Sequence, residues 1–268
     1  MATQEPYMPI QVGKALSTVD LGIQGDNTGD NISAKNRSYC ELTGMYWAWK
    51  NLKNVDIIGL CHYRRYFDFH KQCKRMLDIQ AFKTEEFDKI DLSIPQEVID
   101  NLKDGEAVVA RKKYYMVNLY NDYCYCHISD DIRTLDKVIM ETQPDYWDSF
   151  NEVMWNNNAL IHYNMFMMTW HDFDEYCQWL FTVLAEVEKR TDITHYTPVQ
   201  MRIYGYMAER LFNVYLHAKK FKLKHHNVIW FNDDAKNPST FTKIQQNFRG
   251  CASFFLVKRW RKEFGPHQ

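Results

Sequence analysis

Residues that break regular structure are scarce: the 268-residue sequence holds 7 prolines and 10 glycines. No linker rich in serine, glycine or proline divides the chain, so we expect one compact unit. No apolar run approaches the roughly 18 residues that cross a bilayer, which excludes a membrane-spanning protein. The chain opens without the basic and apolar regions of a secretory signal, and we therefore expect a cytoplasmic location.

Excess charge of one sign and a paired cysteine pattern are also missing. Lys and Arg total 33 against 34 Asp and Glu, a formal charge of −1, so no nucleic-acid partner is expected. The 7 cysteines are an odd number, and their spacing along the chain does not suggest disulfide pairs, which indicates reduced thiols. Cys124, Cys126 and His127 come closest to a metal motif, but a structural zinc site needs a second such pair, so no metal site is expected.

Aromatic residues are abundant, at 15% of the chain. The 17 Tyr, 16 Phe and 8 Trp exceed what core packing usually takes. Rings with polar edges suit sugar faces and nucleobases as well as cores, so this excess is a first indication of a ligand of that kind.

The first half of the chain alternates helices with short apolar runs. Apolar residues at helical spacing predict a helix over residues 41–53, and a first-turn proline predicts another over 95–102. Residues 55–61 are typical of a buried strand in a parallel sheet, and 107–110 predict a second buried strand. Helices that alternate with buried strands indicate an α/β fold.

The second half is predicted to be richer in helix. Residues 160–168 alternate as a strand, with His162 and Asn164 on one face. Helices are predicted over about 172–188 and from 197 past 216. On the second helix Arg202, Gly205 and Glu209 lie opposite the apolar side, and Gly205 is expected to leave room for a ligand.

Four separated strings resemble one known protein family. In order they are GDNTGDNISAKNRSYCELTGMYWAWKN (25–51), DIIGLCHYRRYF (56–67), NMFMMTWHDFDEYCQWLF (164–181) and RIYGYMAERLFNVYL (202–216). They are similar to strings of capsular and exopolysaccharide synthesis proteins long labelled as of unknown function, some of which act as galactofuranosyltransferases. The resemblance covers most of the chain and implies a nucleotide-sugar glycosyltransferase with an α/β fold similar to the GT-A class. Within one domain we expect a nucleotide-sugar-binding lobe over about 1–115 and a helix-rich acceptor lobe over about 116–268.

The resemblance also implies the reaction. The expected activity is inverting transfer of a hexose, with galactofuranose among the candidates, from a UDP-sugar to a glycan or lipid-linked glycan in bacterial capsule or O-antigen synthesis. The alternative is a non-catalytic nucleotide- or carbohydrate-binding protein with the same fold. Family members normally open with a strand that ends in a Thr-His-Lys-like turn, whereas this chain opens Met1-Ala2-Thr3-Gln4, so we expect that strand to be missing or remodelled.

The departing diphosphate of such a donor must be stabilised. GT-A enzymes commonly use a divalent ion held by Asp-x-Asp after a buried strand, whereas the resemblance puts His62, Arg64 and Arg65 at that place. Guanidinium groups bind phosphates through bidentate hydrogen bonds, so we expect a reaction that requires no cofactor, with a divalent metal ion as the alternative. The alternative is that both arginines are surface residues paired with Asp68 or other acids.

A polar loop before the first helix supplies further donor contacts. Asp30 and Asn31 are expected to bind nucleoside or sugar hydroxyls, and Lys35 a phosphate, because such hydroxyls need carboxylate and amide partners. The alternative is that these residues form turns and helix caps.

An inverting transfer needs a general base, normally Asp or Glu. Glu209 is the first candidate, and Asp172 and Asp174 are the others, although a place at a helix start also suits the two aspartates as caps. The remaining candidates are expected to line the sugar or acceptor pocket: His162, Asn164 and Arg202.

The chain end, over residues 254–264, mixes basic and aromatic side chains. Such a segment can rest on an anionic membrane surface, where lipid-linked acceptors are found, and we expect peripheral contact with the cytoplasmic face of the inner membrane. The alternative is a last helix packed on the body of the protein.

Overall fold

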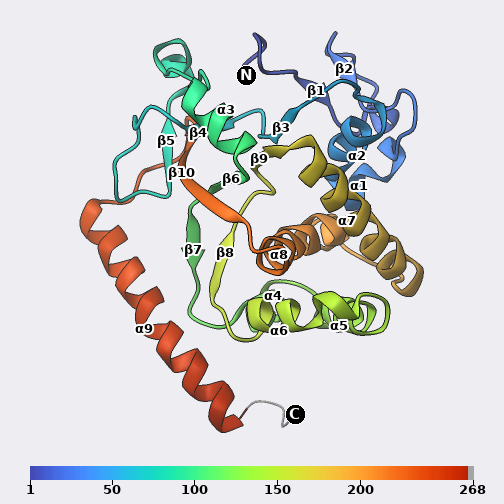
Figure 1. Ribbon diagram of the computed structural model, residues 1–268, viewed down its shortest axis with the longest axis vertical. Helices are drawn as coiled ribbons and strands as arrows, with labels where there is room; N and C mark the ends of the chain where they lie inside the picture. The colour runs from blue at the N-terminus through green and yellow to red at the C-terminus, as the bar shows by residue number, and fades with distance from the viewer. Residues whose placement is uncertain (265–268) are drawn as a thin grey trace.

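The computed structural model describes residues 1–264, except for the side chains of Cys251, Phe254 and residues 257–264. A six-stranded mixed sheet forms its centre, in the order β3-β9-β6-β10-β4, with β5 also paired to β10 (Figure 1). Strands β3, β6 and β10 point the same way, because β9 is antiparallel to β3 and β6 while β6 is parallel to β10. The strands are β3 (Ile57–Leu60), β4 (Arg65–Asp68), β5 (Ile79–Phe82), β6 (Glu106–Ala110), β9 (Phe166–Thr169) and β10 (Lys222–Phe231).

Two small sheets flank the central one. Strands β1 (Ile10–Gln11) and β2 (Gln24–Gly25) pair in parallel, and β7 (Lys112–Tyr114) pairs antiparallel with β8 (Ala159–Ile161). The N-terminal segment therefore adds no strand to the six-stranded sheet. The expectation that the family's first strand is missing or remodelled stays a prediction.

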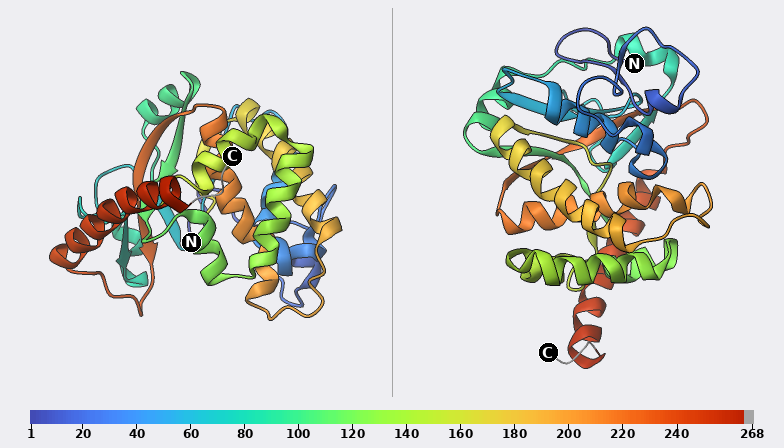
Figure 2. Two further views of the ribbon diagram at one scale, coloured as in Figure 1. Left: turned by 90° about the horizontal axis from the view of Figure 1, so that it is seen from below. Right: turned by 90° about the vertical axis from the view of Figure 1, so that its right-hand side faces the viewer.

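Helices form two further layers beside the sheet. Helices α7 and α8 lie between the sheet and the layer of α4, α5 and α6 (Figures 1 and 2). The helices are α1 (Asn36–Tyr39), α2 (Leu42–Asn51), α3 (Gln96–Lys103), α4 (Leu119–Cys126), α5 (Ser129–Thr142), α6 (Trp147–Met154), α7 (Trp170–Arg190), α8 (Ile203–Ala218) and α9 (Thr240–Phe264). Short 3-10 turns are η1 (Lys14–Leu16), η2 (Ser33–Lys35), η3 (Thr84–Lys89), η4 (Pro144–Tyr146) and η5 (Gln200–Arg202).

The hydrophobic core is centred on helix α8, which lies between the central sheet and the layer of α4, α5 and α6. Apolar residues such as Met207, Leu211 and Phe212 are buried on several of its sides, because β8, β9, α6 and α7 all contact it. Strand β6 is buried along its whole length, as the sequence predicts, and α2, α3 and α7 confirm the predicted helices to within a few residues. The α/β prediction is therefore confirmed, whereas the division near residue 115 into two lobes stays a prediction.

Three local predictions are wrong. The run over 55–61 forms β3, which is a partly exposed edge strand paired antiparallel with β9, the only partner that the described residues give it. The predicted strand over 160–168 is instead β8, a turn and β9, because Tyr163 and Asn164 adopt positive φ angles of 76° and 50°. The helix predicted from residue 197 begins at Ile203, after η5.

Helix α9 extends away from the body (Figure 2). Its middle is anchored where Asn158 Nδ2 donates to Gly250 O at 3.1 Å and Ser253 Oγ donates to Tyr115 O at 2.9 Å. Most side chains of the basic and aromatic chain end, namely Phe254 and residues 257–264, lie outside the described residues. Within residues 1–264 no helix is both long and apolar enough to cross a membrane.

Candidate functional site

The turn between β8 and β9 lies at the carboxyl ends of two parallel strands. Leu60, the last residue of β3, pairs with Phe166 at the start of β9, and Val109 near the end of β6 pairs with the same residue. His62 after β3, Arg111 after β6 and the turn before Phe166 are thus brought to one edge of the sheet. Ligands of open α/β sheets bind outside the carboxyl ends of the strands, so this edge is the candidate site.

Side chains from three other elements hold this turn. Tyr163 N–H donates to Glu209 Oε1 at 2.9 Å, and Asn164 Nδ2 donates to Glu41 Oε1 at 2.8 Å. His62 Nε2 lies 2.6 Å from Tyr163 O, and since a carbonyl can only accept, Nε2 carries the proton. Two consecutive non-glycine residues at positive φ cost about 1–3 kcal/mol each, and such strain clusters at functional sites.

His162, in the same turn, is a neutral ring between two polar groups. Its Nε2 lies 2.7 Å from the Tyr115 hydroxyl, and its Nδ1 lies 3.8 Å from Glu209 Oε2. Burial, together with the nearby cations Lys113 and Arg210, lowers the pKa of His162 to about 3. The ring is therefore uncharged at neutral pH and forms no salt bridge with Glu209.

Glu209 is a carboxylate with limited access to water. Its side chain is 19% exposed, and Arg210 NH1 lies 3.6 Å from Oε2. Burial raises the pKa of Glu209, while Arg210 and the Tyr163 N–H oppose the rise. A raised pKa suits a general base, although a buried carboxylate that only holds a turn would show the same direction of shift.

The two adjacent arginines have different surroundings. The Arg65 guanidinium lies 4.9 Å from the Tyr163 ring centre and 5.5 Å from that of Trp230, and its Nε is buried without a hydrogen-bond partner in the described structure. Arg64 is exposed and lies over the ring of Tyr63, 5.0 Å from its centre. Only Arg65 belongs to the cluster around the turn.

Other predicted donor residues lie elsewhere. Lys35 pairs with Glu188 at 2.7 Å, Asp30 accepts from Tyr46 OH at 3.3 Å, and Asn31 Nδ2 donates to Gly29 O at 2.9 Å. These bonds belong to the loop between β2 and α1 and to its contacts with helices α2 and α7. The structure does not bring Asp30, Asn31 and Lys35 to the Tyr163 turn.

The two alternative bases lie at the opposite end of β9. Thr169, which pairs with Ile57 at the start of β3, caps α7, and its Oγ1 donates to Asp172 Oδ2 at 2.6 Å. Asp174 Oδ1 accepts from Trp49 Nε1 at 2.6 Å. Asp172 therefore has the capping environment that its position predicts, and both aspartates are separated from Glu209.

Gly205 does not leave space for a ligand, as the sequence predicted it would. A Cβ at Gly205 would lie 3.2 Å from Cys40 Sγ, so the space beside the glycine is already occupied by that side chain. Arg202 Nε donates to the same sulfur at 3.3 Å. Arg202 thus approaches the Cys40–Glu41 corner beside the turn, whereas His162 and Asn164 do not share a strand face.

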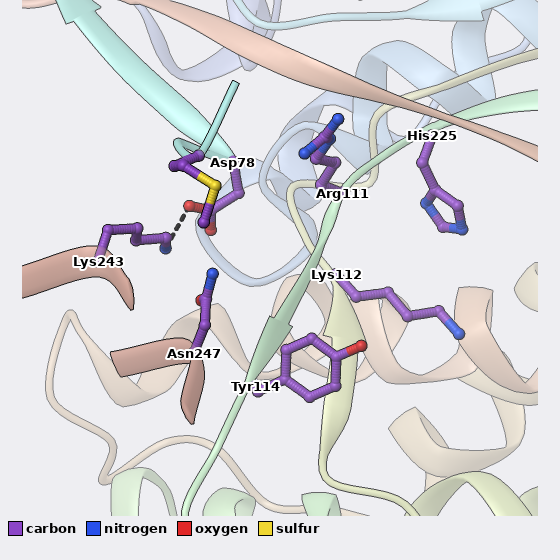
Figure 3. A pocket seen from close by; sticks show the side chains of 8 residues that line it. Asp78, Arg111, Lys112, Tyr114, His225, Lys243 and Asn247 are labelled. Carbon is purple, nitrogen blue, oxygen red and sulfur yellow. Dashed lines mark ion pairs between the residues drawn. The ribbon is translucent and has the colours of Figure 1, made fainter. Parts of the chain in front are cut away.

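A larger cavity opens beside the turn, with a volume of about 490 Å³ (Figure 3). A narrower pocket, which shares Asp78 and Arg111 with it, is lined by His162 and Tyr163. We call the larger space the basic cavity; six of its lining residues are Asp78, Arg111, Lys112, Tyr114, His225 and Lys243.

Two comparisons with known proteins identify what the chain is similar to. A family profile described as "Domain of unknown function (DUF4422)" matches residues 1–220. The chain belongs to this family. A solved structure titled "WbbM bifunctional glycosytransferase apo structure" superposes with a TM-score of 0.77 at 28% identity, and the match covers 86% of this chain. No curated protein matches the chain.

The match to WbbM confirms the expected α/β glycosyltransferase fold and supports the expected family of glycosyltransferases. The DUF4422 chain spans 44% of the length of the WbbM chain, so it corresponds to part of that bifunctional protein. The family description assigns no activity. Capsule synthesis, galactofuranose and a UDP donor therefore stay predictions for this chain.

The sequence analysis did not identify several residues of the site around the Tyr163–Asn164 turn. Glu41 was assigned only to a helix, Tyr163 only to a predicted strand, and Tyr115 to no element or role. A sequence signal exists for the turn alone, because asparagine is enriched at positive φ and Asn164 stands in its middle. Arg111 carries no local signal, since its partners in the basic cavity come from distant segments.

Proposed function

We propose that this DUF4422 chain is a glycosyltransferase that moves a hexose from a UDP-sugar to a glycan acceptor. The observation that carries the proposal is the strained Tyr163–Asn164 turn at the carboxyl edge of the sheet, held by Glu209, Glu41 and His62. Similarity to a bifunctional glycosyltransferase supports it. Galactofuranose is the donor sugar that we would test first.

Arg65 is the proposed partner of the donor diphosphate. Its Nε is a buried donor without a partner, and buried polar groups are normally bonded, so a phosphate oxygen that reached this guanidinium would complete its hydrogen bonding. The aromatic rings of Tyr163 and Trp230 hold the guanidinium plane in place. Arg64, on the exposed side of the same strand end, is proposed to contribute charge at longer range.

Glu209 is the proposed base of an inverting transfer. Its carboxylate takes the proton of the acceptor hydroxyl as the acceptor oxygen bonds to the anomeric carbon, while the bond from that carbon to the diphosphate breaks and UDP leaves with the electron pair. His162 is neutral and lies between Glu209 and Tyr115, so it can orient a hydroxyl without competing for the proton at neutral pH. Asp172 and Asp174 remain the alternative bases.

The test is to incubate the protein with a panel of UDP-sugars and to measure free UDP with and without glycan acceptors. Release of UDP that depends on an acceptor is expected for at least one sugar. Binding of UDP without any turnover across the panel would instead support the non-catalytic alternative. Arg65→Gln is expected to weaken UDP binding, and Arg37→Gln, which changes an exposed arginine in α1, is the matched control.

A further inference from the structure

The basic cavity begins where two strands succeed each other along one edge of β10. Arg111 N–H donates to His226 O at 3.0 Å, and Val228 N–H donates to Asp78 O at 2.9 Å. Positions 226 and 228 of a strand present their backbone groups to the same side, so β6 ends and β5 begins on the same edge. The two segments diverge here, which opens the crevice lined by Asp78, Arg111 and Val228.

Positive charge dominates the cavity wall. Three cationic side chains and one carboxylate line the cavity. Lys243 forms an ion pair with Asp78, whereas Lys112 extends away from that pair and has no carboxylate partner among the described residues (Figure 3). Arg111 NH1 donates to Arg75 O at 3.1 Å, which fixes the guanidinium and leaves its remaining N–H groups for other partners. Two positive charges are therefore uncompensated inside a concave space.

The histidine in the wall adds no charge of its own. His225 Nδ1 lies 3.1 Å from Ala110 O, so Nδ1 carries the proton and Nε2 is left as an acceptor. Burial lowers the pKa of His225, and the nearby Lys112 and Arg111 lower it further. The ring is thus neutral and can accept a hydrogen bond from a ligand.

Helix α9 closes one side of the cavity in a fixed position. Lys243, Asn247 and Gly250 follow one another at helical spacing on one face, and a Cβ at Gly250 would lie 2.5 Å from Tyr114 Cβ. The missing side chain at Gly250 lets α9 pack directly on β7. This contact holds Lys243 and Asn247 over the cavity, beside the exposed ring of Tyr114.

We propose that the basic cavity binds a diphosphate group of a substrate, with Arg111 and Lys112 as its ligands. A diphosphate matches two uncompensated cations, and the space of about 490 Å³ is within the range of small-ligand sites. The inference rests on the proposed function, because Arg111 also lines the narrow crevice beside His162 and Tyr163 of the reaction site. The diphosphate belongs either to the nucleotide donor or to a lipid-linked acceptor.

The first experiment is calorimetric titration of the full chain with inorganic pyrophosphate at constant ionic strength. Binding is expected, and Lys112→Ala and Arg111→Gln should each weaken it about tenfold or more, since each removes a charge-assisted contact. Lys103→Ala is the matched control, because Lys103 is an exposed lysine at the end of α3, beyond the opposite end of β6. Its affinity for pyrophosphate should equal that of the parent.

Two further probes distinguish the source of the diphosphate. Weaker binding of farnesyl diphosphate with UDP unaffected assigns the cavity to a lipid-linked acceptor and leaves the donor diphosphate to Arg65. Weaker binding of UDP in both variants assigns the cavity to the donor and replaces Arg65 as the partner of its diphosphate. The proposal is overturned if Lys112→Ala and Arg111→Gln bind all three probes as the parent does. Failure of the proposed function gives a different result. If the parent protein releases no UDP from any sugar donor but binds pyrophosphate, and both variants bind pyrophosphate more weakly, the cavity assignment holds and the glycosyltransferase proposal does not.

Discussion

Glu209 Oε1 accepts a hydrogen bond at 2.9 Å from the backbone N–H of Tyr163, a residue with a φ of 76°. A carboxylate on α8 thereby stabilises a conformation that non-glycine residues rarely adopt. The next residue, Asn164, has a φ of 50° and donates through its side-chain Nδ2 to Glu41 Oε1 at 2.8 Å. Helices α2 and α8 are thus connected, through the two carboxylates, to one strained turn.

The strain at Asn164 can be measured by comparing two substitutions. Asn164→Gly and Asn164→Ala both remove the bond to Glu41, but only alanine places a Cβ at a φ of 50°. We expect Asn164→Ala to lose about 1 kcal/mol more of the free energy of unfolding than Asn164→Gly. Urea denaturation of both variants measures the difference, and equal stabilities would show that the turn relaxes in the variants.

The spacing of apolar residues predicted those helices and strands whose buried side chains follow the same spacing. Helix α2 and strand β6 were found because apolar residues recur at helical spacing in one and run continuously in the other. The same rule failed at β3, where an apolar run forms an edge strand. Pairing partners far along the chain decide whether such a run lies at the centre or at the edge of a sheet, and a local pattern does not contain them.

The site was only partly predictable for a related reason. His62, Arg65, His162, Asn164 and Glu209 were named from the sequence and come together, but the alternation over 160–168 concealed the turn that joins them. Asp30 and Lys35 carry the polar chemistry of a site, but they bond to Tyr46 and Glu188 away from the turn. The basic cavity needed the fold, because Arg111 and Lys243 approach only when α9 packs on β7.

Turnover is expected to survive metal chelation. If Arg65 and the cations near it stabilise the leaving diphosphate, the departing charge needs no divalent ion. UDP release should therefore be unchanged in excess EDTA, measured on protein dialysed against the chelator. Complete loss of turnover with EDTA that Mn²⁺ or Mg²⁺ restores would contradict this prediction.

Deletion of residues 254–268 should lower binding to anionic vesicles without unfolding the protein. The truncated chain keeps Gly250 and Ser253, which contact Asn158 and anchor α9. Sedimentation with phosphatidylglycerol vesicles measures the loss, phosphatidylcholine vesicles are the control, and UDP affinity should stay the same. A truncated protein that unfolds would show that the chain end belongs to the core.

The last prediction concerns Glu209 as the base. A base adds typically 10²–10⁴-fold to the rate and little to donor affinity, so Glu209→Gln should lower kcat by about that factor with UDP binding nearly unchanged. The glutamine can still accept from Tyr163 N–H, which preserves the turn. Asp172→Asn and Asp174→Asn test the alternative bases, and near-parental activity of Glu209→Gln with either aspartate variant folded but inactive would move the base to α7.

The pH profile separates a base from a residue that only positions the turn. Burial raises the pKa of Glu209, and a base works only when ionised, so kcat/KM should fall as the pH falls through that raised pKa. The acid limb should therefore lie above the pH of about 4.3 that is ordinary for glutamate, and it should disappear in the residual activity of Glu209→Gln. A residual activity that keeps the same acid limb would assign the limb to another group and leave Glu209 a positioning role.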